Sequence, residues 1–343
     1  MTDAQKTFTT RDFRLRSGVV MPEVTIAYQA LGTLSPGRDN VVLITHGFTS
    51  GPDMINPGGT TGEGAWSQLV GPGKPVDTNR YFAVCPNMLG SSYGSTNAAS
   101  IDSTTGKPYG PRFPDITVGD IVATQRLLLD NLGIDTFVAV VGPSYGGYQA
   151  FQWAVDYPYA MKGVAAVVTA PSVSRERSEG RVADFRETLS KNPNWNGGDY
   201  YETGGVLDTM IDIRVATLKS YGIEERLKKS MSDPKQIEAA IRKEATQWAE
   251  GFDANSLVIL AKAMRGFDVT PKFSEIKAKV LYVLSRTDKL FPPEIAPGVM
   301  KGLKDAGVDA DYFLLDSDYG HSASGADAQK WAPRLKEFME NLQ

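Results

Sequence analysis

Six short runs of consecutive apolar residues recur along the chain, and several are separated by segments with helical spacing. Apolar runs of this length are typical of strands that are buried on both faces, as in parallel sheets. The helical segments precede Gly133 and follow the last run at Trp331, Leu335 and Phe338. The runs lie at positions 41–44, 81–84, 137–141, 164–168, 280–284 and 312–315. This alternation predicts an α/β fold, in which a mostly parallel central sheet is flanked by helices.

Two stretches near the N-terminus have other patterns. Within the first 35 residues, Val24, Ile26 and Tyr28 alternate with polar neighbours, which is the period of a strand with one buried face. We therefore expect antiparallel strands at one edge of the sheet. The Gly- and Pro-rich stretch 51–73 predicts a long loop, and such loops are often functional.

A highly charged segment interrupts the alternation in the second half of the chain. Residues 171–273 contain 32 charged residues among 103 positions, 16 basic and 16 acidic. Balanced charge on a helix-like sequence favours a solvated helical insertion over an arm that binds polyanions. We predict a core made of residues 1–170 and 274–343, with residues 171–273 inserted as a helical cap.

Composition excludes several classes of protein. The 343 residues include 36 Lys and Arg against 40 Asp and Glu, a net charge of −4, so no basic excess is present to bind nucleic acid. With one cysteine, Cys85, and two histidines, we expect no internal disulfide and no zinc site. The N-terminal residues lack the regions of a signal peptide, and no apolar run approaches the ~20 residues of a membrane span. We expect a cytoplasmic protein without a membrane partner.

The candidate chemistry begins with a G-x-S-x-G motif, whose serine is Ser144. The motif, residues 142–146, follows the apolar run 137–141 and precedes a helix-like segment at 148–155. That context is the one required by a nucleophile elbow, in which glycines allow a sharp turn and the serine oxygen projects above the sheet. We interpret Ser144 as a nucleophile, with a structural turn as the alternative.

A serine hydroxyl needs a nearby base, and only two histidines are present. His46 ends an early strand and is followed by Gly47, a pair typical of an oxyanion loop, whereas His321 follows the last strand. In the order nucleophile, acid, histidine, His321 is the predicted base.

The acid should lie on the loop after the strand that precedes the histidine's strand. Asp288 directly follows the run 280–284, where a carboxylate would orient the imidazole and stabilise the imidazolium. Asp316 and Asp318 are alternatives, although residues so close to the histidine more often cap a turn.

The oxyanion hole is predicted from backbone N–H groups. Tyr145 follows the nucleophile and supplies one N–H, and Phe48, or else Thr49, supplies the second. The Tyr145 hydroxyl either donates to substrate or packs against the pocket wall.

Longer motifs match a known family. They read GPGK at 71–74, DTNRYF at 77–82, GST at 94–96, TGKPYG at 105–110, FPDIT at 113–117, NPNWNGGDYY at 192–201 and FDANS at 252–256. In these motifs the chain resembles the homoserine O-acetyltransferase family of the α/β-hydrolase superfamily over most of its length. The resemblance implies an α/β-hydrolase fold with a helical cap, and a triad of Ser144, Asp288 and His321 in a tunnel beneath it. It also implies a homodimer formed through cap helices.

The chain departs from the family pattern beside the candidate site. The family's elbow usually reads Gly-Gly-Ser-Met-Gly-Gly, whereas Pro143 and Tyr145 flank the serine here. The family usually has an aspartate after its histidine, which the resemblance assigns to the substrate ammonium group, and this chain has Ser322. A neutral serine cannot form that charge-assisted contact.

From these features we predict a serine hydrolase that cleaves an ester or another activated acyl group of a small molecule through an acyl-enzyme on Ser144, without a cofactor or metal. The alternative is an acyl-CoA-dependent O-acetyltransferase that acts on homoserine or a related alcohol. A binding protein without turnover is disfavoured, because all three residue types of the triad are present.

Overall fold

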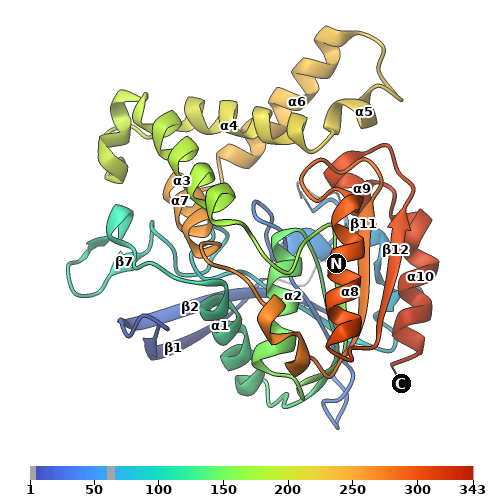
Figure 1. Ribbon diagram of the computed structural model, residues 1–343. Coiled ribbons are helices and arrows are strands. Elements are labelled where there is room, and N and C mark those ends of the chain that lie inside the picture. Colours follow the sequence, from blue (N-terminus) through green and yellow to red (C-terminus); the bar gives the residue numbers. More distant parts are fainter. Residues whose placement is uncertain (1–4, 60–65, 343) are drawn as a thin grey trace.

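The computed structural model describes residues 5–59 and 66–342. Within them, an eight-stranded sheet runs through the molecule in the order β1-β2-β6-β3-β9-β10-β11-β12 (Figure 1). Its strands are β1 (Lys6–Arg14), β2 (Val20–Leu31), β3 (Val41–Ile44), β6 (Phe82–Pro86), β9 (Phe137–Pro143), β10 (Met161–Val167), β11 (Lys279–Ser285) and β12 (Ala310–Leu315). All neighbours from β6 to β12 pair in parallel. At the other edge, β1 pairs antiparallel with β2, and β2 pairs antiparallel with β6. The predicted fold class is confirmed.

The central strands are buried on both faces, because helices cover each side of the sheet. Val41, Leu43 and Val140 point into one apolar core, which is shared with helices of that face. Val42 and Ile44 point into the opposite core. The first face is covered by α1 (Val118–Asn131), α2 (Tyr145–Asp156) and α8 (Ala296–Asp305), and the second by α10 (Ala328–Glu340) (Figure 1). The predicted C-terminal helix is α10, which buries Trp331, Leu335 and Phe338.

The predicted loop at 51–73 contains short elements. A single 3₁₀ turn covers Pro52–Ile55, another covers Trp66–Gln68, and β4 (Val70–Gly71) pairs with β5 (Val76–Asp77). A second small pair joins β7 (Ile101–Asp102) to β8 (Lys107–Pro108). Positions 60–65 of this loop lie outside the described residues. So do residues 1–4, which belong to the N-terminal stretch in which no signal peptide is predicted.

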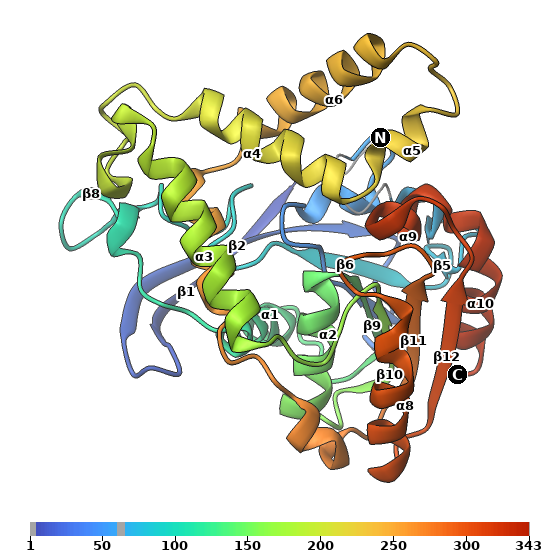
Figure 2. The same cartoon turned by 45° about the horizontal axis from the view of Figure 1, so that its top comes forward.

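Five helices lie between β10 and β11, within the predicted cap segment. They are α3 (Arg175–Ser190), α4 (Leu207–Ser220), α5 (Ile223–Leu227), α6 (Pro234–Ala249) and α7 (Ala254–Ala263). Helices α3, α4 and α6 pass over the carboxyl ends of the parallel strands (Figure 2). Helix α4 packs on α6 and α3 packs on α7. The core and the cap helices therefore enclose the ends of the strands that carry the predicted site.

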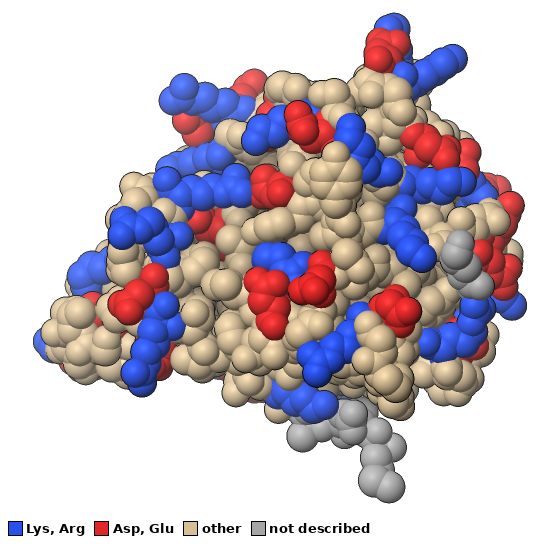
Figure 3. All heavy atoms as spheres, turned by 90° about the horizontal axis from the view of Figure 1, so that it is seen from below, with Lys and Arg blue, Asp and Glu red and all other residues tan. Residues whose placement is uncertain are grey.

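Charged residues of both signs are distributed over the surface. On the face turned away from α4 and α6, Lys and Arg lie among Asp and Glu, without a broad area of one sign (Figure 3). In the described part of the chain, no helix is both long enough and apolar enough to cross a membrane. The same residues contain no group of three or more His, Cys, Asp or Glu side chains that could hold a metal ion.

Candidate active site

The turn between β9 and α2 holds Ser144 in an unusual backbone conformation, with φ 55° and ψ −119°. A positive φ is uncommon for a residue with a side chain and is a form of strain that occurs at functional sites. The turn needs Gly146, because a Cβ there would lie 2.0 Å from the carbonyl oxygen of Thr45. Helix α2 starts at Tyr145, three residues before the predicted segment, so Ser144 stands directly at the helix start.

Three predicted side chains meet beneath the cap. His321 Nε2 lies 2.9 Å from Ser144 Oγ, and His321 Nδ1 lies 2.8 Å from Asp288 Oδ2. With the Nδ1 proton directed at the carboxylate, Nε2 is left to accept a hydrogen bond from the serine hydroxyl. The structure thus brings together the serine, histidine and aspartate that chain order singled out.

The Asp288 carboxylate is buried but well supplied with donors. Its Oδ1 accepts hydrogen bonds from the backbone N–H groups of Leu290 and Phe291, at 2.8 and 3.2 Å. Burial acts to raise the pKa of Asp288, but the charge and hydrogen bond of His321 and the two N–H groups outweigh it, and the pKa lies below its usual value. Asp288 is therefore ionised at neutral pH and can hold the imidazole in one tautomer.

The alternative residues lie elsewhere. Asp316 and Asp318 both bind Arg286 on the surface, with oxygen–nitrogen distances of 2.6 and 2.5 Å. The other histidine, His46, has its Nδ1 2.9 Å from the Gly47 carbonyl oxygen, and its Nε2 accepts from a backbone N–H. Complete burial lowers the pKa of His46 to about 4, so this ring is neutral and occupied with structural contacts.

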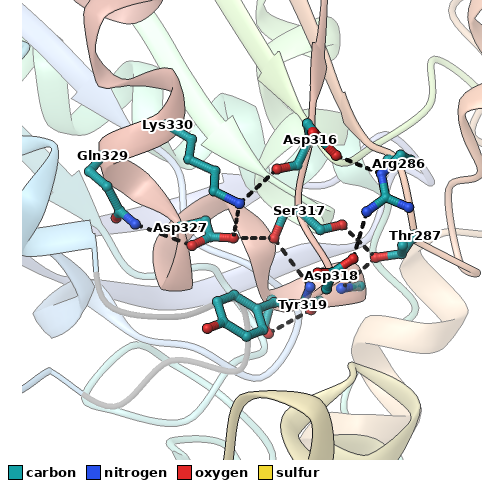
Figure 4. A network of polar contacts seen from close by, with 11 residues as sticks. Arg286, Thr287, Asp316, Ser317, Asp318, Tyr319, Asp327, Gln329 and Lys330 are labelled. Carbon is teal, nitrogen blue, oxygen red and sulfur yellow. Dashed lines mark hydrogen bonds and ion pairs between the residues drawn. The ribbon is translucent and has the colours of Figure 1, made fainter. Parts of the chain in front are cut away.

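A polar network joins the loop that carries the aspartate to the loop that carries the histidine (Figure 4). The Thr287 hydroxyl donates to the carbonyl oxygen of Ser317 at 2.9 Å and accepts from the N–H of Gly320 at 3.0 Å. The Ser317 hydroxyl in turn donates to Asp327 at 2.5 Å. Arg286 adds the two ion pairs described above. The contacts of Thr287 join the loop of Asp288 to the loop of His321 and so support the hydrogen bond between these two residues, whereas the ion pairs of Arg286 lie exposed at the surface.

Phe48 and Tyr145, the predicted oxyanion residues, both line the pocket at Ser144. Their ring centroids are 5.8 Å apart, and their backbone N–H groups have no hydrogen-bond partner among the described residues. The backbone N–H of Thr49, the alternative, likewise has no hydrogen-bond partner among the described residues, so Thr49 stays an alternative donor; its hydroxyl accepts from Arg214 and its carbonyl oxygen from Trp248. The Tyr145 hydroxyl donates to a carbonyl oxygen of α7 at 3.2 Å, so it packs against the wall.

The pocket above Ser144 is narrow, with a volume of about 20 Å³, enough for one water molecule. Besides Ser144 it is lined by Phe48, Tyr145, Tyr148, Val173, Arg177, Arg181, Tyr221, Met264, Leu290 and Phe291. These lining residues include no carboxylate. The pocket shares Arg177, Arg181 and Tyr221 with a cleft of about 840 Å³ between α3 and α4. It also shares Val173, Arg177, Leu290 and Phe291 with a cleft of about 670 Å³, so two clefts border the pocket at Ser144.

Several arginines matter that the motifs did not identify. Arg214, on α4, is buried, donates to the Thr49 hydroxyl at 2.7 Å and stacks 4.8 Å above the Trp248 ring. It ties the cap to the loop beside Phe48. Its one sequence signal is its place between two β-branched apolar residues, Ile213 and Val215, on α4. Arg177 and Arg181 carry no motif at all, and only their placement on α3 brings them to the pocket.

Comparison with known proteins places the chain in a family. The model of the alpha/beta hydrolase fold family matches residues 40–325. The chain belongs to this family. The homoserine O-acetyltransferase of Methanosalsum zhilinae is 36% identical over 356 aligned residues, which cover 96% of this chain and 71% of the relative. The resemblance predicted from the motifs is confirmed.

Solved structures of this family include both transferases and esterases. A homoserine O-acetyltransferase from Bacillus anthracis has a TM-score of 0.86 and 26% identity, and the match covers 98% of this chain and 97% of that one. Esterase E22 has a TM-score of 0.87 and the same identity, with 98% and 99% covered. The chain is thus an enzyme of the α/β-hydrolase superfamily. Its similarity to the homoserine O-acetyltransferase of Methanosalsum zhilinae favours the acetyltransferase alternative over a plain hydrolase.

Proposed function

We propose that the protein is an O-acyltransferase, which moves an acyl group from an activated donor to Ser144 and then to the hydroxyl of a small alcohol. The observation that carries the proposal is the buried hydrogen-bonded series Ser144, His321 and Asp288. The choice of an alcohol as acceptor is supported by the homoserine O-acetyltransferase that is 36% identical to this chain.

In the first half-reaction, Ser144 Oγ attacks the acyl carbonyl carbon while His321 Nε2 accepts its proton. The backbone N–H groups of Phe48 and Tyr145 stabilise the oxyanion that forms. When the tetrahedral intermediate collapses, the bond to the donor's thiolate or alkoxide breaks, and His321 returns the proton to that leaving group. Asp288 keeps Nδ1 protonated throughout and stabilises the imidazolium.

In the second half-reaction, the acceptor hydroxyl loses its proton to His321 and attacks the acyl carbon of the acyl-enzyme. The Ser144 ester bond then breaks, and Ser144 Oγ takes the proton back. A water molecule in the acceptor position would give hydrolysis by the same steps. The pocket of about 20 Å³ has room for one water molecule, so the choice of an alcohol over water as acceptor is supported by the relatives and not by the pocket volume.

Ester hydrolysis is the second candidate, because two observations favour it. The fold matches esterase E22 as closely as it matches the transferase structure. In addition, Ser322 follows the histidine and its hydroxyl donates to the carbonyl oxygen of Tyr319, so no carboxylate at that position can meet an ammonium group.

The two candidates differ in how CoA release responds to an acceptor. Acetyl-CoA turnover should be measured alone and with homoserine, serine or a simple alcohol such as glycerol, and the ester product should be quantified. Transfer predicts that an alcohol accelerates CoA release and that ester forms in equal amount. Release that no alcohol changes, with acetate as the sole product, would refute transfer and favour hydrolysis.

A further inference from the structure

Arg177 and Arg181 stand at the mouth of the pocket above Ser144. They lie one turn apart on α3, so their side chains share one face of the helix. They are the charged side chains among the described residues that line this pocket, and both also line the cleft between α3 and α4. Arg177 also lines a second cleft, of about 670 Å³, that borders the same pocket, so each of the two clefts meets the pocket at one or both of these guanidinium groups.

Aromatic rings hold both guanidinium groups in place. The Arg177 guanidinium lies 4.9 Å from the centroid of the Phe291 ring, and that of Arg181 lies 5.6 Å from the centroid of Phe48. Phe291 in turn packs against the His321 ring, with centroids 5.5 Å apart. Cation–π contacts of this kind orient a guanidinium while leaving N–H groups on its edge available. The two cations are therefore positioned directly beside the residues proposed to react.

Neither arginine has its charge neutralised within the described residues. Arg177 donates to the backbone carbonyl oxygen of Leu290 at 2.8 Å, and no ion pair joins Arg177 or Arg181 to a carboxylate there. Their neighbour on the same helix, Arg175, is bound to Glu179 at 2.7 Å. Two unneutralised like charges one turn apart destabilise a helix, so this pairing has a cost that an anion between them would remove.

The charge of the pair acts on the interior of the pocket. Burial raises the pKa of Tyr148 to about 12, and the charges of Arg177 and Arg181 oppose that rise. The outer cleft is different, because Glu176, Asp184 and Asp212 also line it. The cationic character is therefore confined to the mouth, next to Ser144.

We propose that Arg177 and Arg181 bind an anionic oxygen group, a carboxylate or a phosphate, of the molecule that reacts at Ser144. The planar guanidinium fork matches both groups, and two forks on one helix face can hold a single anion from two sides. This inference rests on the proposed function, since it assigns the anion to the acyl donor or to the acceptor.

The test compares charged substrates with neutral counterparts in the double variant Arg177→Gln/Arg181→Gln. One pair is acetyl-CoA and S-acetyl-N-acetylcysteamine, which share the thioester but differ in phosphates. The other is 4-acetoxybenzoate and its methyl ester, which differ in a carboxylate. The control is Arg186→Gln, which removes the same charge from an exposed position of α3 outside the pocket.

We expect the double variant to lose about 10- to 100-fold in kcat/KM for the charged member of one pair, because charge-assisted hydrogen bonds are lost. The kcat/KM of the double variant for the neutral member of that pair should change less than threefold. In the control Arg186→Gln, kcat/KM should stay unchanged for both members. A loss confined to acetyl-CoA identifies a phosphate, and a loss confined to 4-acetoxybenzoate identifies a carboxylate.

Equal losses within both pairs, or no loss in either, would overturn the inference. Failure of the proposed function looks different, because turnover of the neutral substrates would then persist in Ser144→Ala. The neutral substrates also report on folding, because a misfolded double variant would turn over neither the charged nor the neutral substrate of each pair. Such a variant would also show no thermal unfolding transition.

Discussion

Replacing Asp288 by Asn tests the proposed role of the carboxylate with little change in shape. The amide oxygen can still accept hydrogen bonds from the N–H groups of Leu290 and Phe291, which now bind Asp288 Oδ1. The amide nitrogen then faces His321 Nδ1, which must accept rather than donate. The imidazole proton moves to Nε2, where it points at Ser144 Oγ and blocks proton transfer from the hydroxyl.

The size of the effect follows from the geometry. With 2.8 Å between His321 Nδ1 and Asp288 Oδ2, the centres of the two charged groups are about 4 Å apart. At an effective dielectric constant of 20, unit charges at that distance attract by about 4 kcal/mol, which the imidazolium loses in the variant. At 1.36 kcal/mol per tenfold, this gives about a 10³-fold loss of kcat. The wrong tautomer of His321 lowers kcat further, so we expect a total loss of about 10⁴-fold in kcat.

The assay is the steady-state hydrolysis of p-nitrophenyl acetate, with thermal unfolding measured in parallel. Asp318→Asn is the matched control, because it removes a carboxylate that pairs with Arg286 at the surface. Such exposed pairs contribute about 0–1 kcal/mol to stability, so the control should keep its activity within about twofold. A loss below tenfold in Asp288→Asn, or an equal loss in Asp318→Asn, would refute the assignment of the acid.

Three further predictions concern stability and assembly. The pKa of His46 is about 4 in the folded protein against 6.5 for a free histidine, so the unfolded chain binds a proton first as the pH falls, and this histidine should lower the free energy of unfolding by about 3 kcal/mol between pH 6.5 and 4. Carboxylates with a lowered pKa, such as Asp288, also lose stability as the pH falls, so urea titrations should show a drop in both proteins that is about 3 kcal/mol larger in the wild type than in His46→Gln. Gly146→Ala places a Cβ against the Thr45 carbonyl and should cost at least about 2 kcal/mol, whereas Gly180→Ala, which meets no atom within 4 Å, should gain up to about 1 kcal/mol in the same titration. The homodimer implied by the family predicts a light-scattering mass of twice 37.2 kDa, and a mass of 37.2 kDa would contradict it.

The central strands were predictable because burial on both faces leaves long apolar runs. The run 312–315 differs from that expectation, because it lies in β12, an edge strand whose Leu314 is 42% exposed. The run at 41–44 coincides with β3, while β10 begins at Met161, three residues before its run. An exposed Lys162 and the small Gly163 interrupt the apolar pattern at that end of the strand. Helix α2 was predicted too short for a related reason. Its first turn contains two glycines, poor helix formers that the close packing at the elbow requires.

The candidate triad was predictable because motif and chain order constrain it, whereas the arginines of the pocket were not. Ser144, Asp288 and His321 follow β9, β11 and β12 of the parallel part of the sheet, and the carboxyl ends of parallel strands meet at one edge. Arg177 and Arg181 reach the same place only because α3 packs on α7 above that edge. Their i, i+4 spacing is visible in the sequence and places both on one face of α3. Whether that face lies toward the pocket or toward solvent depends on how α3 packs in the folded protein.

The most direct test of the account is intact-protein mass spectrometry after brief mixing with acetyl-CoA or p-nitrophenyl acetate, in the wild type and in Ser144→Ala. We predict an added acetyl group on the wild type, located at Ser144 by peptide mapping, which clears faster when an alcohol acceptor is supplied. The Ser144→Ala variant should form no adduct. An acetyl group on another residue, or equal labelling of the variant, would contradict the acyl-enzyme on which the proposed function depends.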